Sequence, residues 1–426
     1  MNNNAAEKIL LVEDSVVFSK VISEKLVKEL GFECILAKSY KEAREILEGN
    51  SFTFFAAILD LVLPDAQDGE IVDYVLSKKI PSIILTGQIN DDIREKIITK
   101  NVLDYIVKEG AYSLEQLIKV LRRIKRNKNV SVLVVDDSRV SRHAIKAMLE
   151  SHNFNVFEAE NGEEALSVLS GTPDIKLVVS DYHMPVMDGF TLISKIRQKY
   201  HMDEMAVIGI SAMGNPLVSA QFLKKGCNDF IIKPFAREEF LCRINQNMEM
   251  LDYIEDIRNA AVRDYLSGLY NRRFFFDVGA KLFENAKREN ISITIAAIDI
   301  DHFKRINDKY GHHAGDVVIK DIAKIMQSFF RTSDIIARMG GEEFCIIATN
   351  MKKSYFNVFD DFRKKIEEQR LSILQGELTY TVSIGVVTDL DETFEETIKK
   401  ADELLYKAKN SGRNIVVTDS KETTPL

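Results

Sequence analysis

The stretches Ile9-Leu-Leu-Val-Glu-Asp-Ser15 and Ser131-Val-Leu-Val-Val-Asp-Asp-Ser138 are apolar runs that each end in two carboxylates and a serine. Later landmarks recur in the same order, namely Asp60 and Asp181, Thr86 and Ser211, and Lys108 and Lys233. The matched positions lie 121 to 125 residues apart. A repeat of about this length is a whole domain and not a solenoid unit. The sequence therefore predicts two copies of one domain, each able to fold by itself.

Within each copy, short apolar runs alternate with segments whose apolar residues recur at helical spacing. In the first copy the runs cover residues 9–12, 56–59, 82–85 and 105–107. Runs that are apolar on both faces are typical of buried parallel strands, so each copy is predicted to be a doubly wound, flavodoxin-like α/β sheet. Ligands bind such sheets at the carboxyl ends of the strands, where the matched polar residues fall.

The acids at this edge of each sheet predict a cation site. Two carboxylates about 4 Å apart repel by about 4 kcal/mol at an effective dielectric of about 20, and a third converges on the same edge. Oxygen ligands favour Mg²⁺, which readily bridges to a phosphoryl group. Solvated strand-end acids would be the simpler interpretation of one carboxylate, but a matched set that occurs twice argues against it.

Both copies resemble response-regulator receiver domains, which accept a phosphoryl group on an aspartate. The resemblance implies that Asp60 and Asp181 are the acceptors, with one Mg²⁺ per phosphorylatable receiver and a sensor histidine kinase or phosphotransfer protein as partner. Beside the acceptors, the implied metal ligands are Glu13, Asp14, Asp136 and Asp137, and the implied switch residues are Thr86, Tyr105, Lys108, Ser211, Phe230 and Lys233. The second copy matches more fully, because Lys233 precedes a proline whereas Lys108 precedes Glu109.

Composition limits the possible partners. The 426 residues suggest roughly three domains of about 150 residues. With 65 acidic and 57 basic residues the formal charge is -8, which argues against DNA or RNA as partners. Neither a long apolar span nor a signal-peptide pattern occurs, so a cytoplasmic protein without membrane insertion is expected. The four cysteines form no C-x-x-C pair, which argues against a disulfide framework or a zinc site.

Two segments outside the repeat motifs leave alternatives open. The basic run 122–128 is interpreted either as a partner patch or, preferably, as cations that complement a helix dipole. After Pro234 a helix of some 25 residues is predicted. Its apolar stripe is Leu241, Ile244, Met248, Leu251, Ile254, Ile257 and Ala261. We favour an irregular two-stranded seam between protomers over packing onto the chain's own domain.

From about residue 263 the pattern changes. Residues 291–298 predict a strand that leads into Asp299 and Asp301, and residues 334–339 and 343–348 predict a hairpin around Gly340 and Gly341. A P-loop motif is absent from the sequence. A strand-end Asp299 and a turn Glu342 could instead share two metal ions that neutralise a triphosphate and activate a hydroxyl.

The region 263–415 resembles a GGDEF-type diguanylate cyclase domain, with Gly-Gly-Glu-Glu-Phe at 340–344 and Asp264-Tyr-Leu-Ser-Gly-Leu-Tyr-Asn-Arg272 at its start. The family converts two GTP into cyclic di-GMP and two diphosphates. The resemblance implies Asp299, the Ile300 carbonyl and Glu342 as ligands of two Mg²⁺ or Mn²⁺ ions, and Glu342 and Lys304 as catalytic residues with Asp299. The implied GTP-binding residues are Phe303, Asn307, Asp316, Gly340, Gly341, Lys409 and Arg413.

A further motif, Arg331-Thr-Ser-Asp334, matches the family's product-inhibition site, and Arg363 is the nearest candidate for a second arginine. Two GTP molecules and one product imply a homodimer, and phosphorylation is hypothesised to shift its geometry through the long helix. The rival hypothesis is a catalytically silent receiver or phosphorelay scaffold, or a cyclic di-GMP receptor. The predicted organisation is a receiver at 1–127, a second at 128–247, a helical linker at 248–262, an α+β cyclase domain with a mostly antiparallel sheet at 263–418 and a disordered tail at 419–426.

Overall fold

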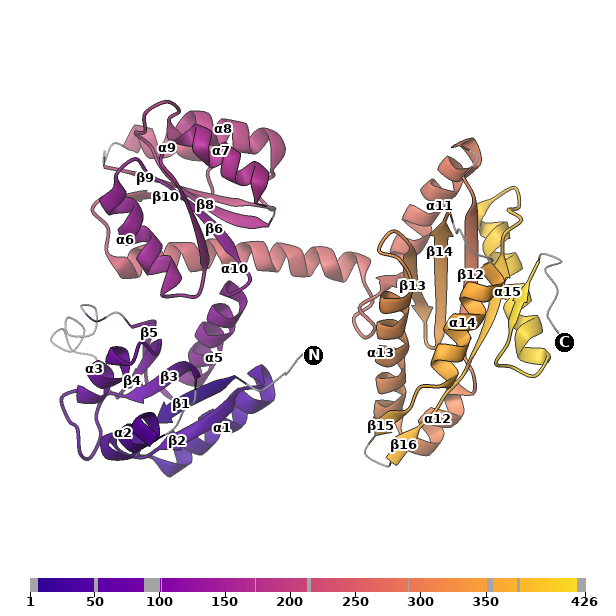
Figure 1. Ribbon diagram of the computed structural model, residues 1–426, viewed down its shortest axis with the longest axis horizontal. Coiled ribbons are helices and arrows are strands. Elements are labelled where there is room, and N and C mark those ends of the chain that lie inside the picture. The colour runs from indigo at the N-terminus through magenta and orange to yellow at the C-terminus, as the bar shows by residue number, and fades with distance from the viewer. Residues whose placement is uncertain are drawn as a thin grey trace. The chain divides into compact units, whose positions relative to one another are not determined.

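The computed structural model describes residues 7–49, 53–87, 100, 102–172, 174–212, 216–289, 291–350, 355–373 and 376–419. The chain forms two compact units, Met1–Ile254 and Glu255–Leu426 (Figure 1). Each unit has its own hydrophobic cores and carries its own candidate sites. No helix in the described ranges is long and apolar enough to cross a membrane.

The N-terminal unit begins with a parallel sheet, called the first sheet, of strand order β2-β1-β3-β4-β5. Its strands are β1 (Lys8–Val12), β2 (Glu33–Ala37), β3 (Phe54–Asp60), β4 (Ser82–Thr86) and β5 (Asp104–Val107). Its helices are α1 (Val16–Leu30), α2 (Tyr40–Gly49), α3 (Glu70–Ser77) and α5 (Gly110–Asn127). Apolar cores on both faces, one under α1 and α5 and the other under α2 and α3, make it doubly wound.

The second sheet of this unit has the strand order β10-β9-β8-β6-β7, which is the same topology written from the other edge. Its strands are β6 (Ser131–Val135), β7 (Asn155–Ala159), β8 (Ile175–Asp181), β9 (Ala206–Ser211) and β10 (Asp229–Ile232). Its helices are α6 (Arg139–Glu150), α7 (Gly162–Gly171), α8 (Gly189–Lys199), α9 (Pro216–Lys224) and α10 (Arg237–Val262). The predicted duplicated α/β fold is confirmed.

The serine that follows each carboxylate pair starts the next helix. The hydroxyl of Ser15 accepts a hydrogen bond from the backbone N–H of Phe18, and Ser138 accepts one from Ser141. Each side chain thus satisfies an N–H group that the first turn of a helix leaves without a partner. Because the strand ends and the helix begins within a few residues, the acids are held at the edge of the sheet.

The long helix α10 differs from the predicted seam. Leu241, Ile244, Met248 and Leu251 are buried in the core of the second sheet, where α10 packs beside α6. This half of the stripe therefore packs onto its own domain, and a seam starting at Leu241 is wrong. The helix has no break at the predicted boundary after residue 247. Farther along the predicted stripe, Ile257 is 69% exposed, and Met250 and Tyr253 outside the stripe are exposed as well.

The basic run at the end of α5 is used inside the unit. Arg123 and Arg126 both pair with Asp252 of α10, and Arg122 pairs with Glu29. Lys125 donates to the carbonyl of Leu30 at the end of α1. These contacts leave little free charge for a partner, so they favour a structural role for the run.

The C-terminal unit contains a mixed sheet of order β11-β13-β14-β12-β17-β18. The strands are β11 (Tyr270–Asn271), β12 (Ile293–Ile300), β13 (Ile335–Gly340), β14 (Glu343–Thr349), β17 (Val382–Val387) and β18 (Val416–Thr418), with a separate hairpin of β15 (Leu371–Ile373) and β16 (Gly376–Leu378). The central pairs are antiparallel and the edge pairs β11–β13 and β17–β18 are parallel. This agrees with the predicted mostly antiparallel α+β sheet, and the predicted hairpin at 340–341 is confirmed.

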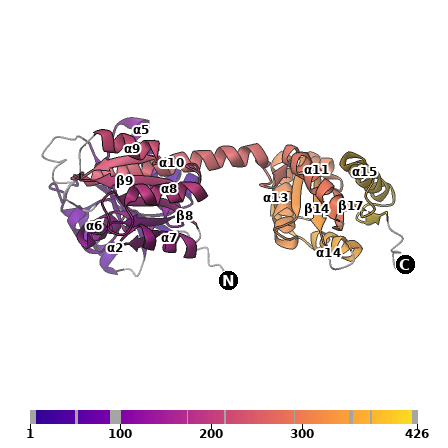
Figure 2. The same cartoon turned by 90° about the horizontal axis from the view of Figure 1, so that it is seen from above.

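Helices cover both faces of this sheet. They are α11 (Arg272–Glu289), α12 (Phe303–Tyr310), α13 (His312–Phe329), α14 (Tyr355–Glu367) and α15 (Phe394–Asn410). One core lies under α12, α13 and α14 and the other under α11 and α15, and Figure 2 shows α13 and α15 on opposite sides of β14 and β17. Asp419 accepts hydrogen bonds from the backbone of Thr388 and Asp389, so it is not part of a disordered tail. The rest of the predicted tail, 420–426, lies outside the described residues.

Candidate functional sites

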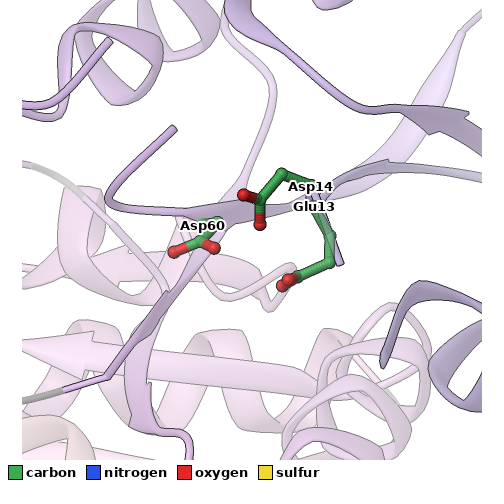
Figure 3. Close-up of side chains that lie close together, drawn as sticks. All are labelled: Glu13, Asp14 and Asp60. Atoms are coloured by element: carbon green, nitrogen blue, oxygen red, sulfur yellow. The ribbon is translucent and has the colours of Figure 1, made fainter. Parts of the chain in front are cut away.

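The first sheet gathers three acids at its carboxyl edge. One carboxylate oxygen from each of Glu13, Asp14 and Asp60 lies within 4.8 Å of the others (Figure 3). Lys108 forms ion pairs with Glu13 at 2.8 Å and with Asp60 at 2.6 Å. Burial raises the pKa of Glu13. Three acids facing one ammonium have the oxygen donors and the excess negative charge that suit a divalent cation.

The second sheet repeats the arrangement with one difference. Lys233 lies 2.8 Å from both Asp136 and Asp181, and burial raises the pKa of Asp181. Ser141 also donates to Asp136 at 2.6 Å. Asp137 is exposed, and within the described part of the chain the acids of this edge do not reach the spacing found in the first sheet. The predicted residues nevertheless meet at the same edge.

The predicted switch residues occupy different environments. Thr86 and Ser211 are buried at the ends of β4 and β9. The ring of Phe230 is buried and packs against Phe222, with centroids 4.9 Å apart. The hydroxyl of Tyr105, by contrast, donates to Glu238 at the start of α10. In the first copy the aromatic position is therefore tied to the second sheet.

In the C-terminal unit, Asp299 lies near the end of β12 and opposite the β13–β14 turn. Its carboxylate accepts from Lys409 of α15 at 2.7 Å. Burial is the main cause that raises the pKa of Asp299 to about 6, and the charges of Glu342 and Glu343 add to it. The backbone N–H of Ile300 donates to the carbonyl of Glu342, which joins the turn to the end of β12. The geometry thus places two predicted metal-binding acids side by side.

The turn itself is held by Arg338 from β13. Gly340 and Gly341 have φ values of 146° and 52°, which a residue with a Cβ rarely adopts. Arg338 donates twice to the carbonyl of Gly341, at 2.9 and 2.8 Å, and once to Asp264 at 2.9 Å. Asp264 in turn accepts from the backbone and hydroxyl of Ser267. The motif at 264–272 therefore supports the turn that carries Glu342, a role not predicted from the sequence.

The predicted base-recognition residues lie on α12 and α13. Oδ1 of Asn307 is buried and has no hydrogen-bond partner among the described residues. A Cβ at Gly315 would lie 2.1 Å from this oxygen, so glycine is required for the close approach of the two helices. Asp316 follows directly and is half-buried, and His302 begins α12 with a left-handed φ of 56°. An unpaired buried amide is suited to a ligand with complementary donors.

The remaining predicted site residues differ in burial and in hydrogen-bond partners. Phe303 is buried, whereas Lys304 and Arg413 are exposed. Arg331 and Asp334 are joined by their own turn, and burial raises the pKa of Asp334. Arg363 uses Nε and Nη1 on Asp360, Glu367 and Asn414, so these groups are already engaged within its own surroundings.

Sequence analysis named Asp301 only as an acid at the end of a predicted strand and assigned it no role. Its buried carboxylate accepts hydrogen bonds from Thr381, Ser383 and the backbone of Asn414. It therefore fastens the end of β12 to β17 and to the segment after α15 that carries Arg413. The spacing Asp299-x-Asp301 puts both acids on one face of a strand, which was the available signal.

Comparison with known proteins agrees with this geometry. Residues 261–415 match the family of diguanylate cyclase GGDEF domains, and residues 132–245 match the response regulator receiver domain. The response regulator PleD of Caulobacter vibrioides is 25% identical over 96% of this chain and 98% of its own length. Diguanylate cyclase A of Treponema denticola is 43% identical over 33% of this chain and 38% of its own length.

A crystal structure of a two-component system response regulator/GGDEF domain protein is 38% identical, with a TM-score of 0.52, and the match covers 58% of this chain and 99% of that one. The chain therefore belongs to the family of response regulators that carry a GGDEF domain. It is a receiver-linked diguanylate cyclase. The matched receiver segment corresponds to the second sheet.

Proposed function

We propose that the protein is a phosphorylation-regulated diguanylate cyclase that condenses two GTP into cyclic di-GMP and two diphosphates. The observation that carries the proposal is the meeting of Asp299, the Glu342 turn and Lys409 at one end of β12. Asp299, the Ile300 carbonyl and Glu342 would hold two Mg²⁺ or Mn²⁺ ions, which when bound neutralise triphosphate charge. The raised pKa of Asp299 suits a site that a cation completes.

The residues around this centre would position GTP. The amide carbonyl of Asn307 and the carboxylate of Asp316 would accept hydrogen bonds from the ring N–H and the exocyclic amine of guanine, groups that adenine presents differently. Phosphate contacts are proposed for Phe303, Lys304, Lys409 and Arg413, with Gly340 and Gly341 against the nucleotide. Lys409 is already turned toward Asp299, which supports its assignment.

In the proposed reaction, Glu342 takes the proton of the ribose 3′-hydroxyl. The oxygen then bonds to the α-phosphorus of a second GTP while the bond to diphosphate breaks, and this happens twice. Each domain holds one GTP, so two protomers must face each other. A homodimer is therefore part of the proposal.

Both sheets of the N-terminal unit are proposed to act as receivers, in segments 1–127 and 128–247, with one metal ion each. An oxygen of Asp60 or Asp181 would bond to phosphorus as the bond to a donor histidine breaks. The matched ammonium contacts of Lys108 and Lys233 support both assignments. Phosphorylation adds about -2 charge at the edge, which would shift the dimer equilibrium, with the new geometry relayed by the helix from Leu241 to Ala261. A population change from about 1% to 50% needs only about 2.7 kcal/mol.

Product inhibition is proposed at Arg331 and Asp334. A guanidinium can bind phosphate or guanine, and the carboxylate can accept from guanine. Oδ1 of Asp334 is buried without a partner among the described residues, which supports a ligand there. Arg363 is the candidate for a second arginine at this site, although its Nε and Nη1 already bond Asp360, Glu367 and Asn414.

The test is the purified chain with GTP and Mg²⁺, with and without beryllofluoride, followed by chromatography of the products. We expect cyclic di-GMP and a higher rate with beryllofluoride. Glu342→Gln should abolish the product, whereas Glu284→Gln on the exposed face of α11 should not. Absence of product in every condition would favour a silent scaffold or a cyclic di-GMP receptor. Asp60→Asn and Asp181→Asn would separate the two receivers.

A further inference from the structure

A cavity of about 510 Å³ lies inside the N-terminal unit, between the first and second sheets. Its walls are β5 and α5 on one side and the start of α10 on the other, with apolar surface from Val120, Ile124 and Leu241. Cavities of roughly 300–1,000 Å³ with apolar walls and a few polar groups are the usual size for small-molecule sites. The cavity is distinct from both carboxylate edges described above.

Direct contacts join the two sheets beside this cavity, which opens to solvent. Besides the Tyr105–Glu238 hydrogen bond, the ring of buried His152 lies 3.2 Å from the carbonyl of Leu103. Arg126 pairs with Asp252 at 2.9 Å. The cavity is thus part of a formed interface between two folded sheets.

Two arginines bring unsatisfied donors to this cavity. Arg123 is 8% exposed, and its Nη2 donates to Asp252. Its Nε and Nη1 are buried without a partner among the described residues. Arg237 donates from Nη2 to the hydroxyl of Ser151, and its Nε is likewise buried and unpaired. Within the described ranges no carboxylate pairs with Arg237. Arg237 as a whole is half-buried, and this partial burial without an anion is unfavourable for its charge and lowers the pKa of Arg237.

The acids that line the cavity do not compensate these donors. Glu249 is paired with Lys119 at 2.9 Å, and Glu238 accepts from Tyr105. Asp104 accepts a hydrogen bond from the backbone N–H of Tyr105, and in the described ranges it forms no ion pair with Arg123 or Arg237. Oδ1 of Asn245, which has no partner among the described residues, adds one hydrogen-bond acceptor to the wall. The buried guanidinium nitrogens of Arg123 and Arg237 therefore still lack hydrogen-bond acceptors, which an anion would supply.

We propose that this cavity binds a small organic anion, in which a carboxylate or a phosphoryl-type group is joined to an apolar ring. The oxyanion would accept from Arg123 and Arg237, because a planar guanidinium fork matches such oxygens. The ring would lie on Val120, Ile124 and Leu241. Such a ligand would bridge α5 of the first sheet to α10, the helix that leaves toward the cyclase region.

Isothermal titration of the full chain tests the proposal, in buffer without divalent metal so that the carboxylate edges do not hold oxyanions. The probes are phenylphosphonate and benzoate, which distinguish the two oxyanions, with methylphosphonate lacking the ring and benzyl alcohol lacking the charge. We expect saturable binding of one molecule of at least one aromatic anion per chain. The two control compounds should bind at least tenfold more weakly.

Matched variants locate the site. Arg123→Gln should weaken binding about tenfold, as expected for a charge-assisted hydrogen bond. Arg126→Gln is the control, because Arg126 shares Asp252 but is half exposed and does not line the cavity. Arg237→Gln gives an independent result if Arg123→Gln disturbs the interface. The proposal is overturned by no binding of either aromatic anion, by equal binding of methylphosphonate, or by unchanged binding in both arginine variants.

Cys242 supplies a second readout that does not depend on activity. Its thiol lines the cavity and is exposed, while Cys34 lies on β2 of the first sheet and does not line it. Bound ligand should slow alkylation of Cys242 at least fivefold, with Cys34 unchanged, as measured by mass spectrometry of peptides. Equal slowing at both thiols, or none at Cys242 under saturating ligand, would contradict the location.

Discussion

Arg338 and Asp264 form a 2.9 Å ion pair that joins the start of the C-terminal unit to its signature turn. The same guanidinium holds the carbonyl of Gly341, next to Glu342. Arg338 of β13 thereby holds a turn whose two glycines could adopt many other backbone conformations. The pair is largely buried, so its loss leaves a charge and a carbonyl without partners.

Replacing this arginine should affect both activity and stability. Arg338→Gln is expected to reduce kcat at least tenfold and to destabilise the unit by about 2 kcal/mol, because one ion pair and two hydrogen bonds are lost. Initial-rate kinetics and urea unfolding measure the two effects. Arg273→Gln on α11, with its exposed and looser pair to Asp277, serves as control. Full activity in Arg338→Gln would show that the turn needs no support.

The raised pKa of Asp299 predicts a pH-dependent stability. Because the pKa is about 6 in the folded state against 3.8 ordinarily, the folded state binds the proton more tightly, and stability is lost as pH rises from about 4 to about 6. Metal-free Asp299→Asn, which resembles the protonated form, should therefore have a higher Tm than the wild type at pH 7. The difference should shrink at pH 4.5.

Differential scanning calorimetry in EDTA measures this difference, and added Mg²⁺ should stabilise the wild type more than the variant. Lys409 opposes the effect through its contact with Asp299. A variant that is less stable than the wild type at pH 7 without metal would mean that this ion pair outweighs the cost of burying the carboxylate.

Gly315 should tolerate no larger residue. In Gly315→Ala the new methyl group would lie 2.1 Å from Oδ1 of Asn307, so α12 and α13 must separate or Asn307 must move. We expect a higher KM for GTP and a destabilisation of about 1–3 kcal/mol, as for overpacked sites. Gly171→Ala, where a Cβ meets nothing within 4 Å, is the control. An unchanged KM would argue against Asn307 in base recognition.

Asp301 is expected to be a positioning residue. Asp301→Ala removes the acceptor shared by Thr381, Ser383 and Asn414, and each buried donor left unpaired costs about 1–3 kcal/mol. Unfolding in urea should show a loss of several kcal/mol in this unit. Asp308→Ala, an exposed position on α12, should have little effect. A small loss of unfolding free energy in Asp301→Ala would show that these hydrogen bonds contribute little to the stability of the unit.

Much of the fold followed from the sequence, because its signals are local. The apolar runs before Glu13 and Asp136 predicted parallel strands, and Gly340 and Gly341 predicted a hairpin. The environment of α10 was harder to predict. Apolar residues at helical spacing look the same whether they face a partner helix or the chain's own sheet, and only packing shows that Leu241 to Leu251 face inward.

By itself, the sequence determined the duplicated α/β architecture, the third region and most candidate site residues, since strand ends and glycine turns are encoded within a few neighbouring positions. Tertiary structure decided which groups form ion pairs or hydrogen bonds with one another. Arg338 with Asp264, Asp301 with Ser383, and Arg123 with Asp252 are far apart in the chain. Such pairs depend on how sheets and helices pack, and no local pattern of residue types specifies them.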